Sequence, residues 1–122
     1  MMLRVSAMTT ETEVDLQGVN GDAAGAAMGI EYGVELMSFA ESLAQRDEHG
    51  LARSRAALRQ AAGDKVLVDA AGVAANFQRM VRIADSIGIP FDNMQSDFVN
   101  SIQTELNLTR FASAQHSLAD IQ

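Results

Sequence analysis

Four polar residues of this chain follow one another at three-residue spacing: Asn76, Arg79, Arg82 and Asp85. On a helix, side chains three positions apart are neighbours, so an amide, two guanidinium groups and a carboxylate could act together. Arginine forks pair well with carboxylate groups. We therefore predict a candidate ligand-binding site here for a small anion or a small organic acid. A structural network that links helix ends is the simpler interpretation, and both remain open.

The sequence offers few candidate residues for thiol chemistry, metal binding or phosphate binding. The chain has no cysteine, which excludes disulfides, thiolate metal sites and thiol-based catalysis. His49 and His116 belong to no metal-ligand spacing, so we expect both on the surface and predict no metal and no other cofactor. The glycines lack the preceding strand and the lysine of a phosphate-binding loop. We therefore assign no catalytic residue.

The four polar residues are expected on a long helix over residues 64–88, around which the other elements are arranged. Asp64 can accept hydrogen bonds from the first free amides of this helix. Gly88 suits a left-handed C-cap, and Pro90 cannot continue the helix. The first half is apolar almost all round, which predicts that it is buried. The second half has one polar and one apolar side.

Apolar side chains at helical spacing predict further helices. They are residues 28–46, residues 51–62 after a turn at 47–50, a helix capped by Asp92 that ends at Asn107, and a short helix capped by Thr109. Short connections favour antiparallel neighbours. We therefore predict an all-α fold, an antiparallel helical bundle of four to five helices around a long central helix.

The N-terminal residues 1–20 are predicted to be a flexible tail, because their threonine and acidic side chains offer little apolar area to bury. Met8 is an alternative start of the chain. Residues 21–122 are then expected to form a single helical domain.

Glycines recur every four residues at the beginning of this domain, at Gly21, Gly25, Gly29 and Gly33. On a helix they would line one side and let another backbone approach closely. The alternative is an irregular segment that becomes helical near Met28. We favour helix at Gly29 and Gly33 and leave both alternatives open for the other two.

The net charge of −7 is unevenly distributed, with −6 in residues 1–45, +3 in residues 46–82 and −4 in residues 83–122. Such an acidic chain is expected to avoid nucleic acid and anionic membranes. No long charge-free apolar run predicts a membrane span, and the N-terminus is a poor signal peptide. We therefore expect a cytoplasmic protein.

The run from Asn76 to Asp92 resembles the C-terminal helix and following turn of the alkylhydroperoxidase/carboxymuconolactone decarboxylase superfamily. In that family the long helix often begins with Asn-Phe, continues with Asn/Arg-x-Ala-Asp and ends with Gly-hydrophobic-Pro. The matching residues here are Asn76-Phe77, Arg82-Ile83-Ala84-Asp85 and Gly88-Ile89-Pro90. Residues 35–43 resemble the helix that follows the catalytic half in larger members of the family, so the likeness covers about residues 31–92. It implies an alkylhydroperoxidase-like, all-helical fold that assembles into symmetric oligomers.

The chain departs from this family at the reactive centre. Family peroxidases carry a Cys-x-x-Cys motif with a nearby histidine and glutamate, whereas cysteine is absent here. The redox activity is therefore not carried over. We expect a small non-catalytic helical protein with a structural role or a partner- or ligand-binding role. The alternative is a cysteine-free enzyme of the carboxymuconolactone decarboxylase type that acts on a small organic acid.

The apolar side chains of the helix over 28–46 exceed what one neighbouring helix would cover. Together with aromatic residues of the last two helices they would leave a large exposed patch, which usually marks an interface. Two-fold pairing is the commonest closed arrangement. We therefore predict a homodimer that uses these helices, with close approach along the glycines and with the polar face of the long helix left for a cleft.

Overall fold

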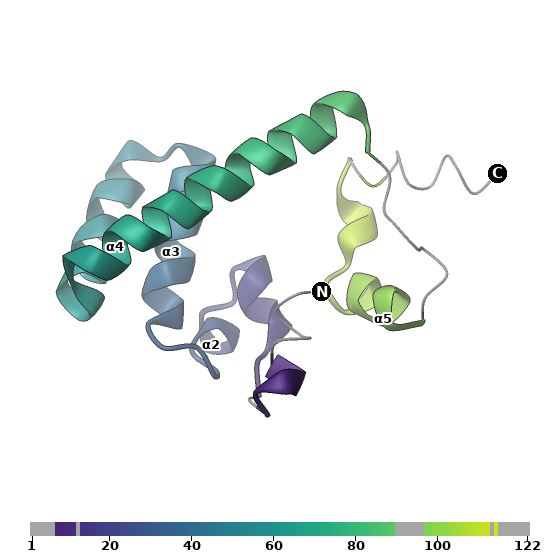
Figure 1. The fold of residues 1–122 in the computed structure, drawn as a ribbon, viewed down its shortest axis with the longest axis horizontal. Coiled ribbons are helices and arrows are strands. Elements are labelled where there is room, and N and C mark those ends of the chain that lie inside the picture. Colours follow the sequence, from purple (N-terminus) through teal and green to yellow (C-terminus); the bar gives the residue numbers. More distant parts are fainter. Residues whose placement is uncertain (1–6, 12, 90–96, 113, 115–122) are drawn as a thin grey trace. The chain divides into compact units, whose positions relative to one another are not determined.

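The computed structural model of the 122-residue chain describes residues 7–11, 13–89, 97–112 and 114 (Figure 1). The elements in these ranges are η1 (Leu16–Asn20), α2 (Ala23–Ala26), α3 (Gly33–Gln45), α4 (Glu48–Ile87), α5 (Asp97–Glu105) and η2 (Leu108–Arg110). All of them are helical, which confirms the all-α prediction for the described part of the chain. The chain divides into two compact units, within residues 2–78 and 79–122, and α4 continues from the first into the second.

The first unit begins with two short helices that pack backbone against backbone. Asp15 and Asp22 cap η1 and α2, because their carboxylates accept hydrogen bonds from the amides of Gln17 and Gly25, each at 2.9 Å. A Cβ on Gly18 would lie 2.8 Å from the Ala26 Cα, and a Cβ on Gly25 would lie 2.8 Å from the Gly18 nitrogen. Since no side chain fits in this space, glycine at both positions is what allows η1 and α2 to touch.

The regular glycine spacing does not correspond to one helix. Gly21 and Gly29 have left-handed φ angles of 92° and 73°, and Tyr32 has a left-handed φ of 56° directly before α3 begins at Gly33. The prediction that Gly29 lies in a helix is therefore wrong. A Cβ on Gly33 would overlap the Ala26 carbonyl group. Gly18, Gly25 and Gly33 thus serve close contacts inside one chain, and the predicted approach of two copies along the glycines stays a prediction.

Leu16 connects η1 to the core of the first unit. Its exposed fraction is 2%, although it falls in the range predicted to be a flexible tail. Ala7 is also buried, whereas residues 1–6 and Thr12 lie outside the described residues. Part of the range 1–20 therefore belongs to the folded unit.

The junction between α3 and α4 is tight. Asp47 caps α4, since its Oδ1 accepts a hydrogen bond from the Gly50 amide at 3.0 Å. Gly50 is buried, and a Cβ there would overlap the Asp47 carboxylate and come within 3.1 Å of the Ser42 hydroxyl. The helix predicted to start after the turn at 47–50 therefore already starts at Glu48.

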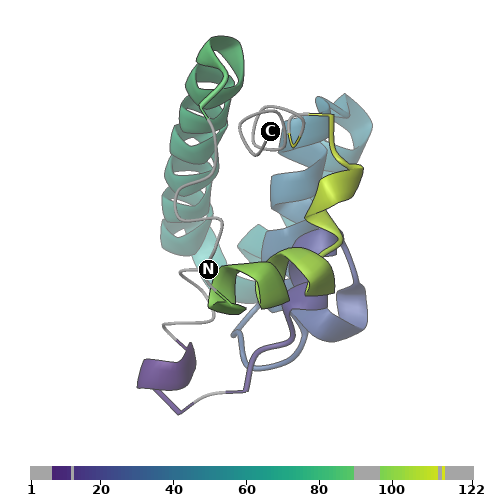
Figure 2. The same cartoon turned by 90° about the vertical axis from the view of Figure 1, so that its right-hand side faces the viewer.

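A break at Gly63 separates α4 into two helical segments. Gly63 has φ 85° and ψ 174°, which no helix can contain. Figure 1 shows that the chain changes direction there, and the segment that follows is one uninterrupted helix in Figures 1 and 2. Arg59 and Asp64 form an exposed ion pair across the break, with 2.6 Å between Nε and Oδ1. The predicted boundary between residues 62 and 64 is confirmed.

The C-terminal end of α4 also agrees with the sequence. Gly88 has a left-handed φ of 66°, and the Ile89 amide donates to the Ala84 carbonyl oxygen at 3.1 Å. This hydrogen bond is that of a Schellman cap. Pro90 lies outside the described residues.

Burial along α4 differs from the prediction. Its buried residues are Gly50, Ser54 and Leu58, all of which precede Gly63. Val68, in the half of the long helix that was predicted to be buried, is 69% exposed. That prediction is wrong, because no residue of α4 after Gly63 is buried.

The second unit contains α5 and η2. Ile102, Leu106 and Ala114 are buried there, and α5 ends where Asn107 takes a left-handed φ of 50°. Thr109 lies inside η2, so it does not cap a following helix as predicted. The predicted cap Asp92 lies outside the described residues. So do residues 115–122, which belong to the short helix predicted after Thr109.

Replacement of Leu16 by alanine tests whether η1 belongs to the folded unit. We expect Leu16→Ala to lower the free energy of unfolding by about 2–5 kcal/mol, since a fully buried leucine is truncated. Val19→Ala is the control, because Val19 lies in the same element and is exposed. Its expected change is within about 0.5 kcal/mol. Urea denaturation measures both, and equally small effects would show that residues 1–20 are a tail.

Two glycines of α4 allow a matched test of the break. A Cβ at Gly63 or at Gly72 meets no atom within 4 Å, so the two sites differ only in backbone conformation. Gly72→Ala is expected to raise the free energy of unfolding by roughly 0.5–1 kcal/mol. Gly63→Ala should lower it by about 1–3 kcal/mol. Stabilisation by both variants in chemical denaturation would contradict the break.

Candidate functional site

The four residues predicted to bind a ligand all lie on α4 and are all exposed: Asn76, Arg79, Arg82 and Asp85. Each step of three residues turns the helix by about 300°, so the side chains wind around the axis and Asn76 and Asp85 point to opposite sides. Only consecutive members are therefore neighbours. The anion site stays a prediction from the sequence.

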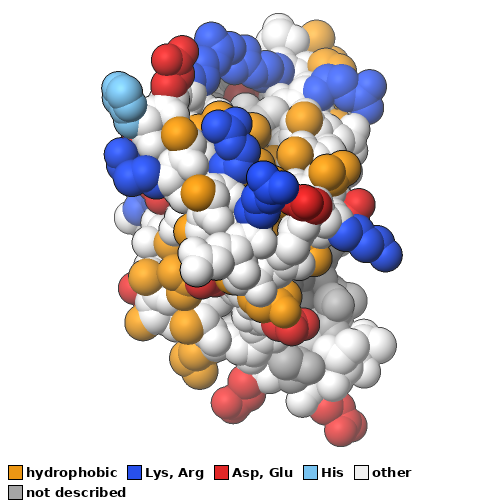
Figure 3. Space-filling view, turned by 90° about the vertical axis from the view of Figure 1, so that its left-hand side faces the viewer, with side chains coloured by type: hydrophobic (Ala, Val, Ile, Leu, Met, Phe, Trp, Pro, Cys, Tyr) orange, Lys and Arg blue, Asp and Glu red, His pale blue; other side chains and the backbone are white. Residues whose placement is uncertain are grey.

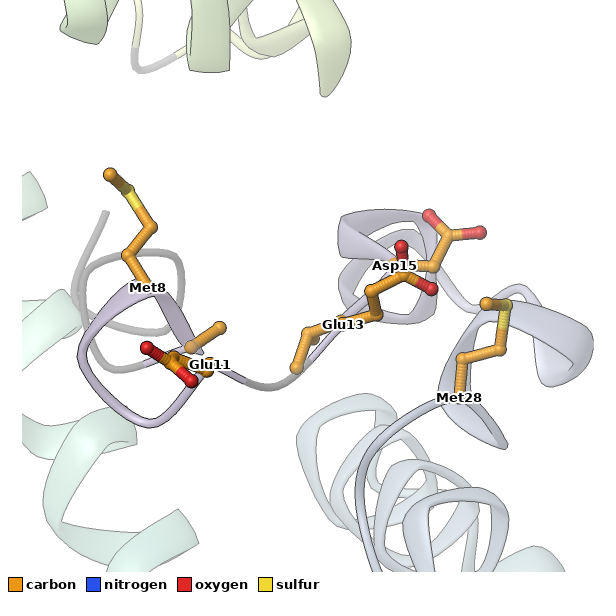
Figure 4. A pocket seen from close by; sticks show the side chains of 7 residues that line it. Met8, Glu11, Glu13, Asp15 and Met28 are labelled. Carbon is orange, nitrogen blue, oxygen red and sulfur yellow. The ribbon is translucent and has the colours of Figure 1, made fainter.

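A shallow hollow of the described residues lies elsewhere, in the first unit. Its volume is about 500 Å³, and its lining is Ala7, Met8, Glu11, Glu13, Val14, Asp15 and Met28. Figure 4 shows Glu11 on the same turn as Met8, away from Asp15 and Met28. None of the four predicted ligand-binding residues lines this hollow.

The carboxylates of this hollow are those of Glu11, Glu13 and Asp15. Asp15 is occupied as the cap of η1, and Glu11 and Glu13 are exposed. Within the part of the chain that the structure describes, no group of histidine and acidic side chains could hold a metal ion. His49 is exposed in the first turn of α4, and His116 lies outside the described residues.

Among the ionisable groups of the described residues, that of Tyr32 has a shifted pKa. A hydrogen bond from the Tyr32 phenol to the Glu31 carboxylate raises the pKa of Tyr32 above its ordinary value of 10.0, and the negative charge of Glu31 raises it further. Both effects favour the neutral phenol. Tyr32 directly precedes α3 and has a left-handed φ of 56°.

A row of apolar side chains lies on α4 after the break. We call it the α4 stripe, and it consists of Val66, Ala70, Val73, Phe77, Met80, Ala84 and Ile87. Val73, Phe77, Met80 and Ile87 are 58%, 54%, 52% and 68% exposed. Val81 and Ile83, which flank the row, are 52% and 53% exposed. Single exposed apolar residues are ordinary, but a continuous row is typical of an interaction surface.

The spacing within the α4 stripe is regular. Successive members are four, three, four, three, four and three residues apart. This alternation keeps the side chains on one side of a helix and is the spacing of a coiled-coil seam. The stripe could thus have been found from the sequence, although the general apolarity of residues 66–75 obscures it.

The basic side chains are unevenly distributed on the surface. In the face shown in Figure 3, the Lys and Arg side chains lie in one half, together with acidic and apolar groups, and the other half carries acidic side chains without basic ones. This distribution agrees with the excess of bases in residues 46–82 and of acids in residues 1–45.

No helix in the described ranges is both long enough and apolar enough to span a bilayer. Comparisons of the chain with protein-family models, with curated proteins and with solved structures find no match. The resemblance to the alkylhydroperoxidase-like superfamily therefore stays a prediction from the sequence.

The pKa of Tyr32 can be measured directly, because it is the single tyrosine of a chain without tryptophan. We expect an ultraviolet titration midpoint above 10.0, and Glu31→Gln should lower it because the charge is removed and the hydrogen bond weakened. Glu41→Gln, in the middle of α3, is the control and should leave the midpoint unchanged. An equal midpoint in all three proteins would contradict the Tyr32–Glu31 contact.

Proposed function

We propose that this chain is a non-catalytic protein that binds another helix through the α4 stripe. The observation that supports the proposal is the exposure of a seam with coiled-coil spacing on a helix whose two ends are defined by Gly63 and Gly88. Such a seam matches the groove formed by the corresponding row of another helix. The role is therefore interaction with a protein partner, as part of an assembly.

The energetics of burial favour this role. A fully exposed Val, Ile, Phe or Met side chain gains roughly 1.5–3 kcal/mol when it is buried. Four members of the stripe are more than half exposed, so covering them would contribute several kcal/mol. Association costs at least about 4 kcal/mol in lost translational and rotational freedom. A partner must therefore bring apolar surface of its own, as a second stripe does.

The enzymatic alternative finds no corresponding observation. A thiol-free decarboxylase would need a histidine and an acid in one pocket, and the described hollow is lined by acids and apolar residues without a histidine. A small organic acid bound by Arg79 and Arg82 would be held on an exposed helix surface. Such exposed charge pairs contribute at most about 1 kcal/mol.

Replacement of Phe77 tests whether the stripe is a surface or part of the chain's own core. We expect Phe77→Asp to change the free energy of unfolding in dilute protein by no more than about 1 kcal/mol. Ala75→Asp, on the opposite side of the same helix, is the control. A loss of about 3–5 kcal/mol for Phe77→Asp alone, independent of protein concentration, would show a core residue and overturn the proposed function.

A thermal-shift assay with small organic acids tests the alternative. We expect no saturable stabilisation of the protein. Saturable stabilisation by a carboxylic acid that disappears in Arg82→Ala would instead favour the ligand site at Asn76, Arg79, Arg82 and Asp85.

A further inference from the structure

We propose that the partner of the α4 stripe is a second copy of this chain, and that the two helices pair antiparallel with Val73 of one copy opposite Phe77 of the other. This inference rests on the proposed function and adds the identity of the partner and its orientation. Two independent features of residues 64–87 support it, the sizes of the side chains in the stripe and the distribution of charge along the helix.

The side-chain sizes of the stripe suit antiparallel pairing. In a parallel pair each residue meets its own copy, so Ala70 and Ala84 would form layers of two small side chains and Phe77 a layer of two large ones. The layers of two alanines would leave voids and the layer of two phenylalanines would be crowded, and close-packed interfaces avoid both. In the antiparallel arrangement the layers are Val66 with Ala84, Ala70 with Met80, and Val73 with Phe77, each formed twice. Every layer then combines a smaller with a larger side chain.

The charges along the helix favour the same orientation. Residues 64–75 carry Asp64, Lys65 and Asp69, a sum of −1, whereas residues 76–87 carry Arg79, Arg82 and Asp85, a sum of +1. Antiparallel pairing brings the acidic half of one copy beside the basic half of the other. The helix dipoles also oppose each other favourably in this orientation. Parallel pairing would place like halves together.

The positions that border the stripe do not oppose pairing. They are Leu67, Asp69, Ala74, Asn76, Val81 and Ile83, of which only Asp69 is charged. Charged residues at these positions decide which coiled-coil partners are rejected. An apolar border therefore extends the buried area and introduces little repulsion between two copies.

A matched pair of substitutions tests self-association in the full-length chain. Ala70 lies in the stripe and Ala75 lies on the opposite side of the same helix, so the change to aspartate is chemically identical at both. We expect a concentration-dependent mass of about twice 13.0 kDa for the unchanged chain and for Ala75→Asp in sedimentation experiments. Ala70→Asp should raise the dissociation constant by at least about tenfold, because a carboxylate enters the seam.

Phe77→Asp serves as a second stripe variant, because Phe77 is more exposed than Ala70 and its replacement is less able to disturb folding. Helical circular dichroism of each variant shows whether the chain is still folded. A mass near 13.0 kDa at all micromolar concentrations would overturn self-pairing. So would a dimer that neither stripe variant weakens. Neither result overturns the proposed function. Whether the stripe is a binding surface is tested separately by the effect of Phe77→Asp on the free energy of unfolding.

Spin labels determine the orientation, since the cysteine-free chain allows one label per copy. Lys65→Cys, Ala75→Cys and Ser86→Cys supply the labels outside the stripe. In the antiparallel register the two labels at position 75 lie at the same level along the axis, on the outer sides of the two helices, whereas those at 65 or 86 are in addition separated by roughly 30 Å along the axis, at 1.5 Å per residue. Similar distances at all three positions would show parallel pairing and overturn the proposed orientation.

Discussion

The backbone of Gly63 takes a conformation that is open to glycine and to almost no other residue, and much of the structure depends on it. An unbroken α4 of 40 residues would extend about 60 Å, far beyond the small core that the neighbouring helices provide. Because the helix breaks at Gly63, the first segment can bury Leu58 completely while the second follows its own direction. The ion pair between Arg59 and Asp64 is exposed and therefore adds little to this arrangement.

Several local features could be predicted from the sequence because their causes are local. The boundary at Gly63 and the cap at Gly88 follow from backbone preferences of single residues. Burial could not be predicted in the same way, since it depends on whether another surface covers the side chain. An apolar segment such as residues 66–75 fits a buried helix and a helix of an assembly equally well. The glycine spacing did not show whether the segment is one helix. The close contacts of Gly18 and Gly33 are with the backbone of Ala26, and these contacts appear only in the folded structure. For the candidate site, the sequence predicts both the helix and, from the three-residue spacing, that the four side chains wind around it.

Because the cores of the two units are small, binding of a partner would also stabilise the folded state. Among the described residues, Leu16 and Leu58 are the large side chains that are almost fully buried. Small units bury a small fraction of their surface and are only marginally stable by themselves. Binding of a partner to the folded state alone stabilises that state by mass action. If the α4 stripe binds a partner as proposed, the same contact would also stabilise the folded chain, and the folded fraction would depend on the concentration of that partner.

The close contact between η1, α2 and the start of α3 has a kinetic consequence. Gly18, Gly25, Ala26 and Gly33 meet within a span of 16 residues, so the chain closes only short loops to bring them together. In the second unit α5 and η2 are likewise neighbours in sequence. Proteins whose contacts are local fold in microseconds to milliseconds, because little loop-closure entropy is lost before native contacts form. The N-terminal helices can therefore assemble early, while the chain beyond Gly63 is still being synthesised.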